Sequence, residues 1–344
     1  MESKNNNNPT DKSGVILLYI SSVLFISILS SSCSTEQGQS KAPINITLAA
    51  EMSLLPATVW VAEQKGFFKK YNITLNVLEY DSGRNALESM LKDPSINIST
   101  VAQTPVVFNS FNNEPYVIFA TMAYSLDDTK LLARKDHGIE KPEDLKGKKI
   151  GATVRSTGHY FLEGFLNHYN YNLQDITLID VNASQLKSKL ESGELDAITS
   201  WEPHISNAEK SLGKEKLTLL ISPTPFRKDF FFTAHKDYAK KHSDRLERFL
   251  SALIDAEDYI SENPEDAQII ISQRLGVKLD LIKKIWKSFT FDVSLEQSIL
   301  VNLENEALWA TAFFKNTKTV PNYLDFIDIK PLSKVKPHSV NLIY

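Results

Sequence analysis

The stretch Lys149-Ile150-Gly151-Ala152-Thr153, followed closely by Ser156-Thr157-Gly158-His159-Tyr160, predicts a buried strand, a short polar turn and the start of a helix. The first N–H groups of a helix have no partner within the helix, and they carry the positive end of its dipole. Such a turn can hold an anionic or polar ligand without a cofactor or a reactive side chain. The stretch therefore indicates a binding site for a small molecule.

An alternation of strands and helices extends on both sides of this stretch. Strands are predicted over 44–49, 73–80, 96–99, 116–122, 149–153, 176–181 and 196–200. Helices are predicted over 56–66, 83–91, 157–169, 184–192 and 202–212, with another that starts at 103. This order is typical of mostly parallel sheets with helices on both faces, which is the α/β class.

The chain is predicted to form two lobes with a cleft between them. Two extended apolar segments, 131–134 and 230–234, are interpreted as the strands by which the chain leaves one lobe and returns. The first lobe then combines 43–134 with 229–344, and the second lobe is 135–228. The part beyond Phe230 is helical, and its last helix is predicted to begin with a capping box of Ser294 and Gln297. The cleft receives the carboxyl ends of several strands, where ligands bind in open α/β sheets.

The N-terminus indicates export from the cytoplasm. A charged start, a mainly apolar run from Val15 to Leu29 and small residues before Cys33 predict a signal peptide (1–32) and a lipidated linker (33–42). Ser30 stands where an aliphatic residue is usual, and the uncharged run is also long enough for an uncleaved anchor. Cys33 is the only cysteine, so the fold has no internal disulfide.

Composition excludes several functional classes. An apolar fraction of 42% and a charged fraction of 23% are ordinary for a globular protein. The net charge of −4 provides no electrostatic footprint for a nucleic acid. Nucleophile-elbow, zinc-protease, redox and phosphate-loop motifs are missing, and the histidines lack ligand spacing. We therefore expect no catalysis, no cofactor and no metal site.

Six blocks of sequence carry a family resemblance. They are Val61-Ala62-Glu63-Gln64-Lys65-Gly66-Phe67-Phe68 together with Asp81-Ser82-Gly83, Thr104-Pro105, the run 145–151, Ser156-Thr157-Gly158-His159-Tyr160 and Trp201-Glu202-Pro203. Over 44–335 the chain resembles the substrate-binding proteins of bacterial ABC importers of the nitrate/sulfonate/bicarbonate type, a group that includes binders of a thiamine pyrimidine precursor. The resemblance implies a type II periplasmic-binding fold, closure about a hinge, and a monomer that delivers its solute to a membrane permease. With the N-terminus, it places the protein in the cell envelope, anchored by lipid.

The resemblance also implies a set of ligand-binding residues, all at strand-to-helix turns. They are Glu51, Ser53, Ser82, Gly83, Thr104, Ser156, Thr157, Gly158, His159, Trp201 and Glu202. Structural roles compete with ligand contact at several of them. Ser156 and Thr157 could cap their helix, Gly158 could serve close packing, and His159 could bond a nearby carbonyl group. Trp201 could belong to the core.

The acidic residues bear on the identity of the solute. Glu202 either faces the ligand or caps the helix that it begins, and a carboxylate inside the cleft repels a bare anion. An inward Glu202 favours a ligand with an amine, and an outward one favours a simple sulfonate or oxyanion. The orientation of Glu51 bears on the identity of the solute in the same way.

Two other classes of function stay open. One is a pyrimidine-synthesis-like enzyme of the same fold, although such enzymes carry a cysteine-rich motif that this chain lacks. The other is an extracytoplasmic sensor module held by an uncleaved helix.

Overall fold

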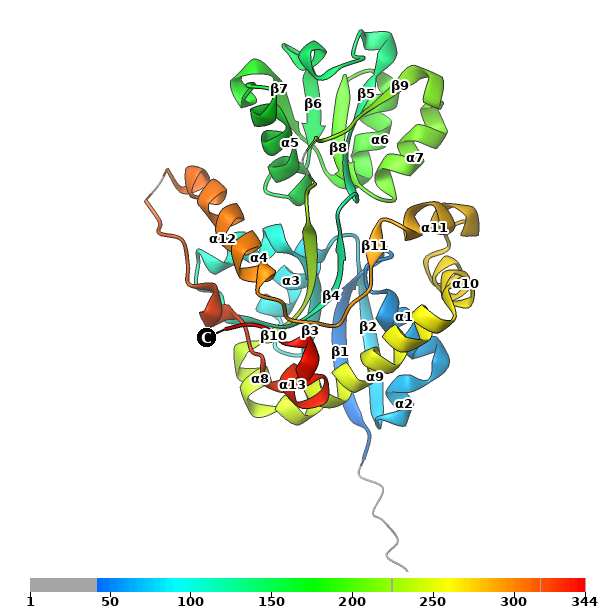
Figure 1. Ribbon diagram of the computed structural model, residues 1–344, viewed down its shortest axis with the longest axis vertical. Coiled ribbons are helices and arrows are strands. Elements are labelled where there is room, and N and C mark those ends of the chain that lie inside the picture. The colour runs from blue at the N-terminus through cyan, green and yellow to red at the C-terminus, as the bar shows by residue number, and fades with distance from the viewer. Residues whose placement is uncertain (1–41, 224, 316, 344) are drawn as a thin grey trace, which may run out of the picture. The chain divides into compact units, whose positions relative to one another are not determined.

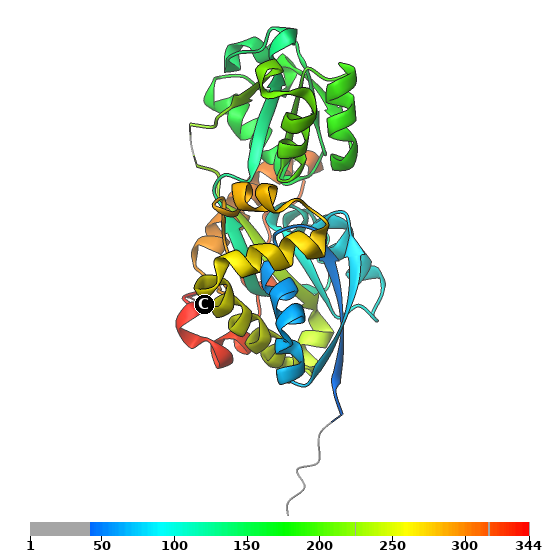
Figure 2. The same ribbon diagram turned by 90° about the vertical axis from the view of Figure 1, so that its right-hand side faces the viewer.

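The computed structural model describes residues 42–223, 225–315 and 317–343. The predicted signal peptide, Cys33 and nearly all of the predicted linker lie outside these described residues. Residues 43–344 group into one compact unit (Figures 1 and 2). No helix among the described residues is both long and apolar enough to cross a bilayer.

Within the described residues, the first sheet has six strands in the order β11-β4-β10-β3-β1-β2. These strands are β1 (Ile44–Glu51), β2 (Ile73–Tyr80), β3 (Ile98–Ala102), β4 (Tyr116–Ser125), β10 (Lys228–His235) and β11 (Phe289–Thr290). Strand β1 runs parallel to β2 and β3, whereas β10 runs antiparallel to β3 and β4.

The second sheet has the order β7-β6-β8-β5-β9. Its strands are β5 (Thr129–Arg134), β6 (Lys149–Ala152), β7 (Thr177–Asp180), β8 (Ala197–Trp201) and β9 (Leu217–Leu220). Strand β6 is parallel to β7 and β8, while β5 is antiparallel to β8 and β9. Residues 129–134 therefore pair in this second sheet, although the predicted lobe boundary stood at 134.

The α/β class is confirmed: most strands of each sheet run in one direction, and the strands that oppose them make both sheets mixed. The antiparallel strands β5 and β10 follow short connections from β4 and β9. Strand β4 lies in the other sheet from β5, and β9 in the other sheet from β10, so β5 and β10 are the strands by which the chain passes between the sheets.

Helices cover both faces of the second sheet, as predicted (Figure 1). They are α5 (Thr157–His168), α6 (Ala183–Ser192) and α7 (His204–Leu212). Leu131 packs in a cluster with α5 residues, whereas Leu132, the next residue along β5, packs with α6 and α7 residues. Alternate side chains of a strand point to opposite faces, so one strand contributes to both layers.

The remaining helices surround the first sheet and share one large apolar core with it. They are α1 (Ala57–Lys65), α2 (Phe67–Lys70), α3 (Gly83–Lys92), α4 (Gln103–Ser110), α8 (Lys236–Lys241), α9 (Ser243–Glu262), α10 (Pro264–Leu275), α11 (Leu279–Trp286), α12 (Ser298–Ala310) and α13 (Lys330–Val335). The helical character of the C-terminal part is confirmed.

The predicted capping box at Ser294 and Gln297 is wrong. Helix α12 begins at Ser298, and its N-cap residue Gln297 makes no side-chain capping bond. The Ser294 carbonyl accepts a hydrogen bond from the Thr121 N–H of β4 at 2.8 Å. That bond ties Ser294 to the first sheet, and the helix begins four residues later, at Ser298.

Candidate functional site

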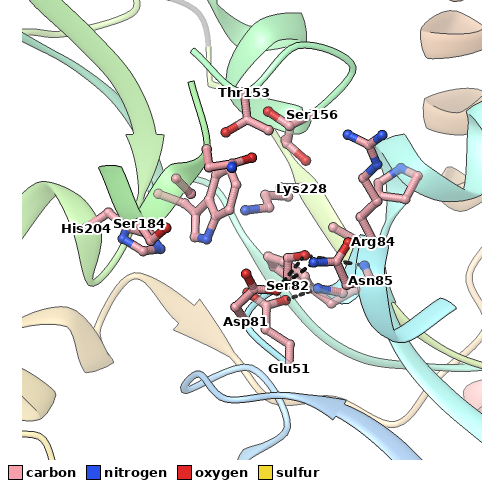
Figure 3. Close-up of a pocket in the computed structure, with 18 residues that line it drawn as sticks. Glu51, Asp81, Ser82, Arg84, Asn85, Thr153, Ser156, Ser184, His204 and Lys228 are labelled. Carbon is pink, nitrogen blue, oxygen red and sulfur yellow. Dashed lines mark hydrogen bonds between the residues drawn. The ribbon is translucent and has the colours of Figure 1, made fainter. Parts of the chain in front are cut away.

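Turns from both sheets line one cavity, which contains about 800 Å³ of space free of protein atoms, including its open mouth (Figure 3). Of the predicted site residues, Glu51, Ser82, Gly83, Ser156, Thr157 and Trp201 line it. Strands β1, β2, β6 and β8 end at these turns, and helices α3 and α5 begin there. The cavity thus lies where the carboxyl ends of parallel strands meet helix N-termini, which suits a polar or anionic ligand.

Lys228 places a buried positive charge in the cavity wall. It is the first residue of β10 and only 2% exposed. Its Nζ donates to Asp128 Oδ2 at 2.5 Å and lies 5.0 Å from the ring centroid of Trp201. An ammonium group has three N–H donors, and Asp128 engages one of them. Lys228 can therefore also donate to a ligand in the cavity.

Glu51 places a titratable acid in the same cavity. Its Oε2 accepts the Gly83 N–H at 3.1 Å. Burial raises the pKa of Glu51 to about 7, although Lys228 and the Gly83 N–H both favour the charged form. Asp128 and Asp81 raise the pKa further. The carboxyl group of Glu51 therefore gains or loses its proton near neutral pH, so a charged ligand in the cavity can shift its protonation state.

The first turn of α3 is positioned by a close backbone approach at Gly83. A Cβ atom on Gly83 would lie 2.9 Å from Val101 Cα and 3.1 Å from the Thr100 carbonyl oxygen, both in β3. Only glycine lets the helix start lie this close to the strand. The same residue directs its N–H to Glu51, so packing and site geometry depend on one position.

We expect Gly83→Ala to lower the free energy of unfolding by about 1–3 kcal/mol, because the added methyl group forces α3 away from β3. The matched control is Gly164→Ala in the exposed middle of α5, where a Cβ meets nothing within 4 Å. That change should raise stability by about 0.5–1 kcal/mol, as alanine favours helix. Urea denaturation measures both, and wild-type stability of Gly83→Ala would contradict the close approach.

Ser156 and Ser82 occupy equivalent positions before α5 and α3, but their hydroxyl groups differ. The Ser82 Oγ caps its helix by accepting the Asn85 N–H at 3.3 Å. Ser156 makes no capping bond, and its buried Oγ has no hydrogen-bond partner in the described part of the chain. A buried hydroxyl group without a partner is costly unless a ligand satisfies it.

The structure assigns Glu202 to a salt bridge and a helix start. Its Oε1 lies 3.1 Å from Lys130 Nζ, and its Oε2 accepts the Ser206 N–H at 3.1 Å. Glu202 does not line the cavity. Its contacts match the capping role that sequence analysis left open.

Four other predicted residues also do not line the cavity: Ser53, Thr104, Gly158 and His159. The Ser53 Oγ accepts a backbone N–H two residues further on. A Cβ on Gly158 would lie 3.2 Å from the Thr199 carbonyl oxygen, and the His159 ring packs edge-on against an aromatic ring of α12. Ligand contact by these four residues and by Glu202 stays a prediction.

Sequence reasoning missed several residues that line the cavity. They are Asp81, Arg84, Asn85, Asn182, Ser184, His204 and Lys228 (Figure 3). For Lys228 a signal was present, because the charged run Arg227-Lys228-Asp229 leads directly into the apolar strand 230–234, and charged side chains are rarely buried unless they are paired. Among the described residues, no group of three or more His, Cys, Asp or Glu side chains could hold a metal ion.

Comparison with known proteins identifies relatives along most of the chain. The putative aliphatic sulfonates-binding protein of Bacillus subtilis is 26% identical over 331 residues, which cover 92% of this chain and 94% of that protein. The taurine-binding periplasmic protein of Escherichia coli is 27% identical over 227 residues, covering 64% of this chain and 68% of that protein.

Solved structures agree with the fold. The periplasmic aliphatic sulphonate binding protein SsuA from Escherichia coli superposes with a TM-score of 0.70 at 16% identity. The superposition covers 83% of this chain and 98% of that one. Residues 56–267, more than half of the chain, match the NMT1/THI5-like family. This chain therefore belongs to the NMT1/THI5-like family.

Proposed function

We propose that this protein binds a small organic sulfonate outside the cytoplasm and delivers it to the permease of an ABC importer. The observation that carries the proposal is the cavity wall, where the buried ammonium group of Lys228 and the N-termini of α3 and α5 lie together. The relatives named for taurine and for aliphatic sulfonates support the same substrate class.

In this proposal, the sulfonate oxygens accept hydrogen bonds from Lys228 and from the first turn of α5. Ser156 brings a hydroxyl group with no other partner, and Thr157 brings a second one. Hydrogen bonds to a charged group contribute roughly 1.5–3 kcal/mol each. A sulfonate has three oxygens, so it can use several of these donors at once.

Glu51 and Asp81 favour a ligand whose other end is positively charged. Both carboxyl groups line the cavity, and the pKa of Glu51, about 7, leaves it ready to ionise beside a cation. Glu202 is paired with Lys130. Of the two acids considered from the sequence, Glu51 is therefore the one that can attract an amine on the ligand. We therefore propose that an aminosulfonate binds more tightly than a plain alkanesulfonate.

Delivery requires that the parts built on the two sheets close around the ligand. One contact between them joins Lys284 of α11 to α7, where its Nζ lies 2.8 Å from Glu209 and 3.1 Å from Ser206 Oγ. The proposal includes release of this contact when the protein opens.

Attachment to the membrane through a lipidated Cys33 belongs to the proposal on sequence grounds. The intact mass of protein extracted from membranes tests it. A diacylated chain that begins at Cys33 supports the anchor, and a chain that retains residues 1–32 contradicts it.

The binding proposal is tested by thermal shift and calorimetry with taurine, ethanesulfonate, nitrate and bicarbonate. A ligand at about 100 times its dissociation constant adds about 2.7 kcal/mol of stability. We expect taurine and ethanesulfonate to stabilise the protein more than the two inorganic anions do. Stabilisation by no sulfonate would overturn the proposal.

Ser156→Ala should weaken sulfonate binding about tenfold, which is ~1.4 kcal/mol, while the free energy of unfolding hardly changes. The reason is that the Ser156 hydroxyl group makes no internal hydrogen bond that could be lost. Ser82→Ala is the matched control, since it removes a helix cap and should destabilise the fold by about 1 kcal/mol. Calorimetry and urea denaturation measure the two effects, and unchanged affinity in Ser156→Ala would exclude that hydroxyl group from the site.

A further inference from the structure

A buried acid lies two hydrogen bonds away from the cavity. Glu306 of α12 is fully buried, and its Oε1 is hydrogen-bonded to the hydroxyl group of Thr104 in α4. Thr104 Oγ1 lies 3.0 Å from the hydroxyl oxygen of Thr157, which lines the cavity at the start of α5. Three side chains thus connect α12, which packs on the first sheet, to the turn at the start of α5 in the second.

The surroundings of Glu306 compensate its charge only in part. Its other oxygen, Oε2, is buried and has no hydrogen-bond partner in the described part of the chain. From α4 it meets the neutral side chains of Gln103 and Thr104, which favour the charged form. From β10 it meets the opposed charges of Lys228 and Asp229.

The other titratable neighbours of Glu306 are phenol groups. They are Tyr160 of α5 and Tyr323, which lies in a short helical turn over 323–326. Burial is the largest influence on Glu306 and raises its pKa to about 8. The carboxyl group therefore keeps its proton at neutral pH.

The proton on Glu306 determines the direction of the hydrogen bonds in the chain. A hydroxyl group has one proton to donate, whereas an ionised carboxylate can only accept. When Glu306 is ionised, the Thr104 proton goes to Glu306, and Thr157 must donate its own proton to Thr104. When Glu306 is protonated, it donates to Thr104, and Thr104 donates to Thr157. Only then is the Thr157 proton free to point into the cavity.

We propose that Glu306 is a positioning residue that directs the Thr157 hydroxyl group toward an anionic ligand, so that ligand retention depends on the proton carried by Glu306. This inference rests on the proposed function, because it needs an anion in the cavity. It adds a control of affinity by pH that works through Thr104 and not through direct contact with the ligand.

The test measures ethanesulfonate affinity by calorimetry between about pH 7 and pH 9, a range in which this ligand itself does not titrate. Glu51→Gln serves as the background, since the pKa of Glu51 is about 7. His204 also lines the cavity, but burial lowers its pKa below the ordinary 6.5, so it is neutral throughout. In this background we expect the affinity to fall up to about tenfold from pH 7 to pH 9.

Adding Glu306→Gln should remove this pH dependence and keep the high affinity, because the glutamine amide group donates to Thr104 at every pH. Thr104→Val should lower the affinity to a constant value, and Thr104→Ser should restore both the affinity and its pH profile. An infrared band of a protonated carboxyl group, present at pH 7 and lost in Glu306→Gln, tests the protonation state without any ligand.

The outcomes separate the two proposals. An equal pH profile with and without Glu306→Gln overturns the role of Glu306 and leaves the proposed function intact. Should Glu306→Gln not fold, an equal pH profile in Thr104→Val and Thr104→Ser overturns that role instead. Binding of ethanesulfonate by no variant and at no pH overturns the proposed function, and this inference with it.

Discussion

Lys228→Met is expected to lower the free energy of unfolding by about 3–5 kcal/mol, because it leaves the Asp128 carboxylate buried without its partner. Asp128 is 2% exposed, and its Oδ2 lies 2.5 Å from Lys228 Nζ. In the folded protein this charge is almost completely buried, so the substitution leaves most of its desolvation cost uncompensated. Urea denaturation without ligand measures the change.

The double variant Lys228→Met with Asp128→Asn separates stability from binding. Replacing both charges removes the unpaired carboxylate, so most of the lost stability should return. Sulfonate affinity should not return, and we expect it to stay at least about tenfold below wild type, since the ligand has lost a charged donor. A double variant that binds ethanesulfonate as tightly as wild type would show that Lys228 serves the fold alone.

Glu51→Gln is expected to reverse the preference between two sulfonates of equal length at about pH 8. Above its pKa of about 7, Glu51 is mostly ionised, so it attracts the ammonium group of taurine and repels the bare anion ethanesulfonate. The amide removes both effects. We expect the ratio of the two affinities, measured by calorimetry, to shift toward ethanesulfonate by at least about tenfold.

The pH dependence provides a second check on Glu51. Affinity of the wild type for ethanesulfonate should fall as the pH rises through 7, because the neutral acid becomes a carboxylate, and Glu51→Gln should remove that part of the fall. Glu257→Gln is the control, a partly buried acid of α9 that pairs with Lys336 at 2.7 Å and does not line the cavity. An unchanged taurine preference in Glu51→Gln would mean that the amine is recognised elsewhere.

Much of the local structure could be predicted from the sequence, because local patterns decide it. The apolar run at 149–152 and the polar turn after it predict β6 and the start of α5, and the structure contains both. Ser82, Gly83, Ser156 and Thr157 follow strands directly, so their approach to one cavity follows from the rule that ligands bind at strand ends. These inferences need only neighbours in the chain.

The sequence did not predict which distant residues meet. Glu202 is tied to Lys130, which is 72 positions away, and Thr104 reaches Glu306, which is 202 positions away. The sequence also did not predict the antiparallel orientation of β10, because that orientation depends on the two strands, β3 and β4, between which β10 inserts.

Sequence alone therefore determined the α/β class, the helical C-terminal part and several turns around the cavity. Tertiary structure decided that Glu51 lines the cavity and that Glu202 pairs with Lys130. Lys228 and Asp128 are 100 positions apart, and no local pattern joins them. The physical reason is that propensity and capping act over a few residues, whereas burial and charge pairing depend on side chains that only the folded chain brings together.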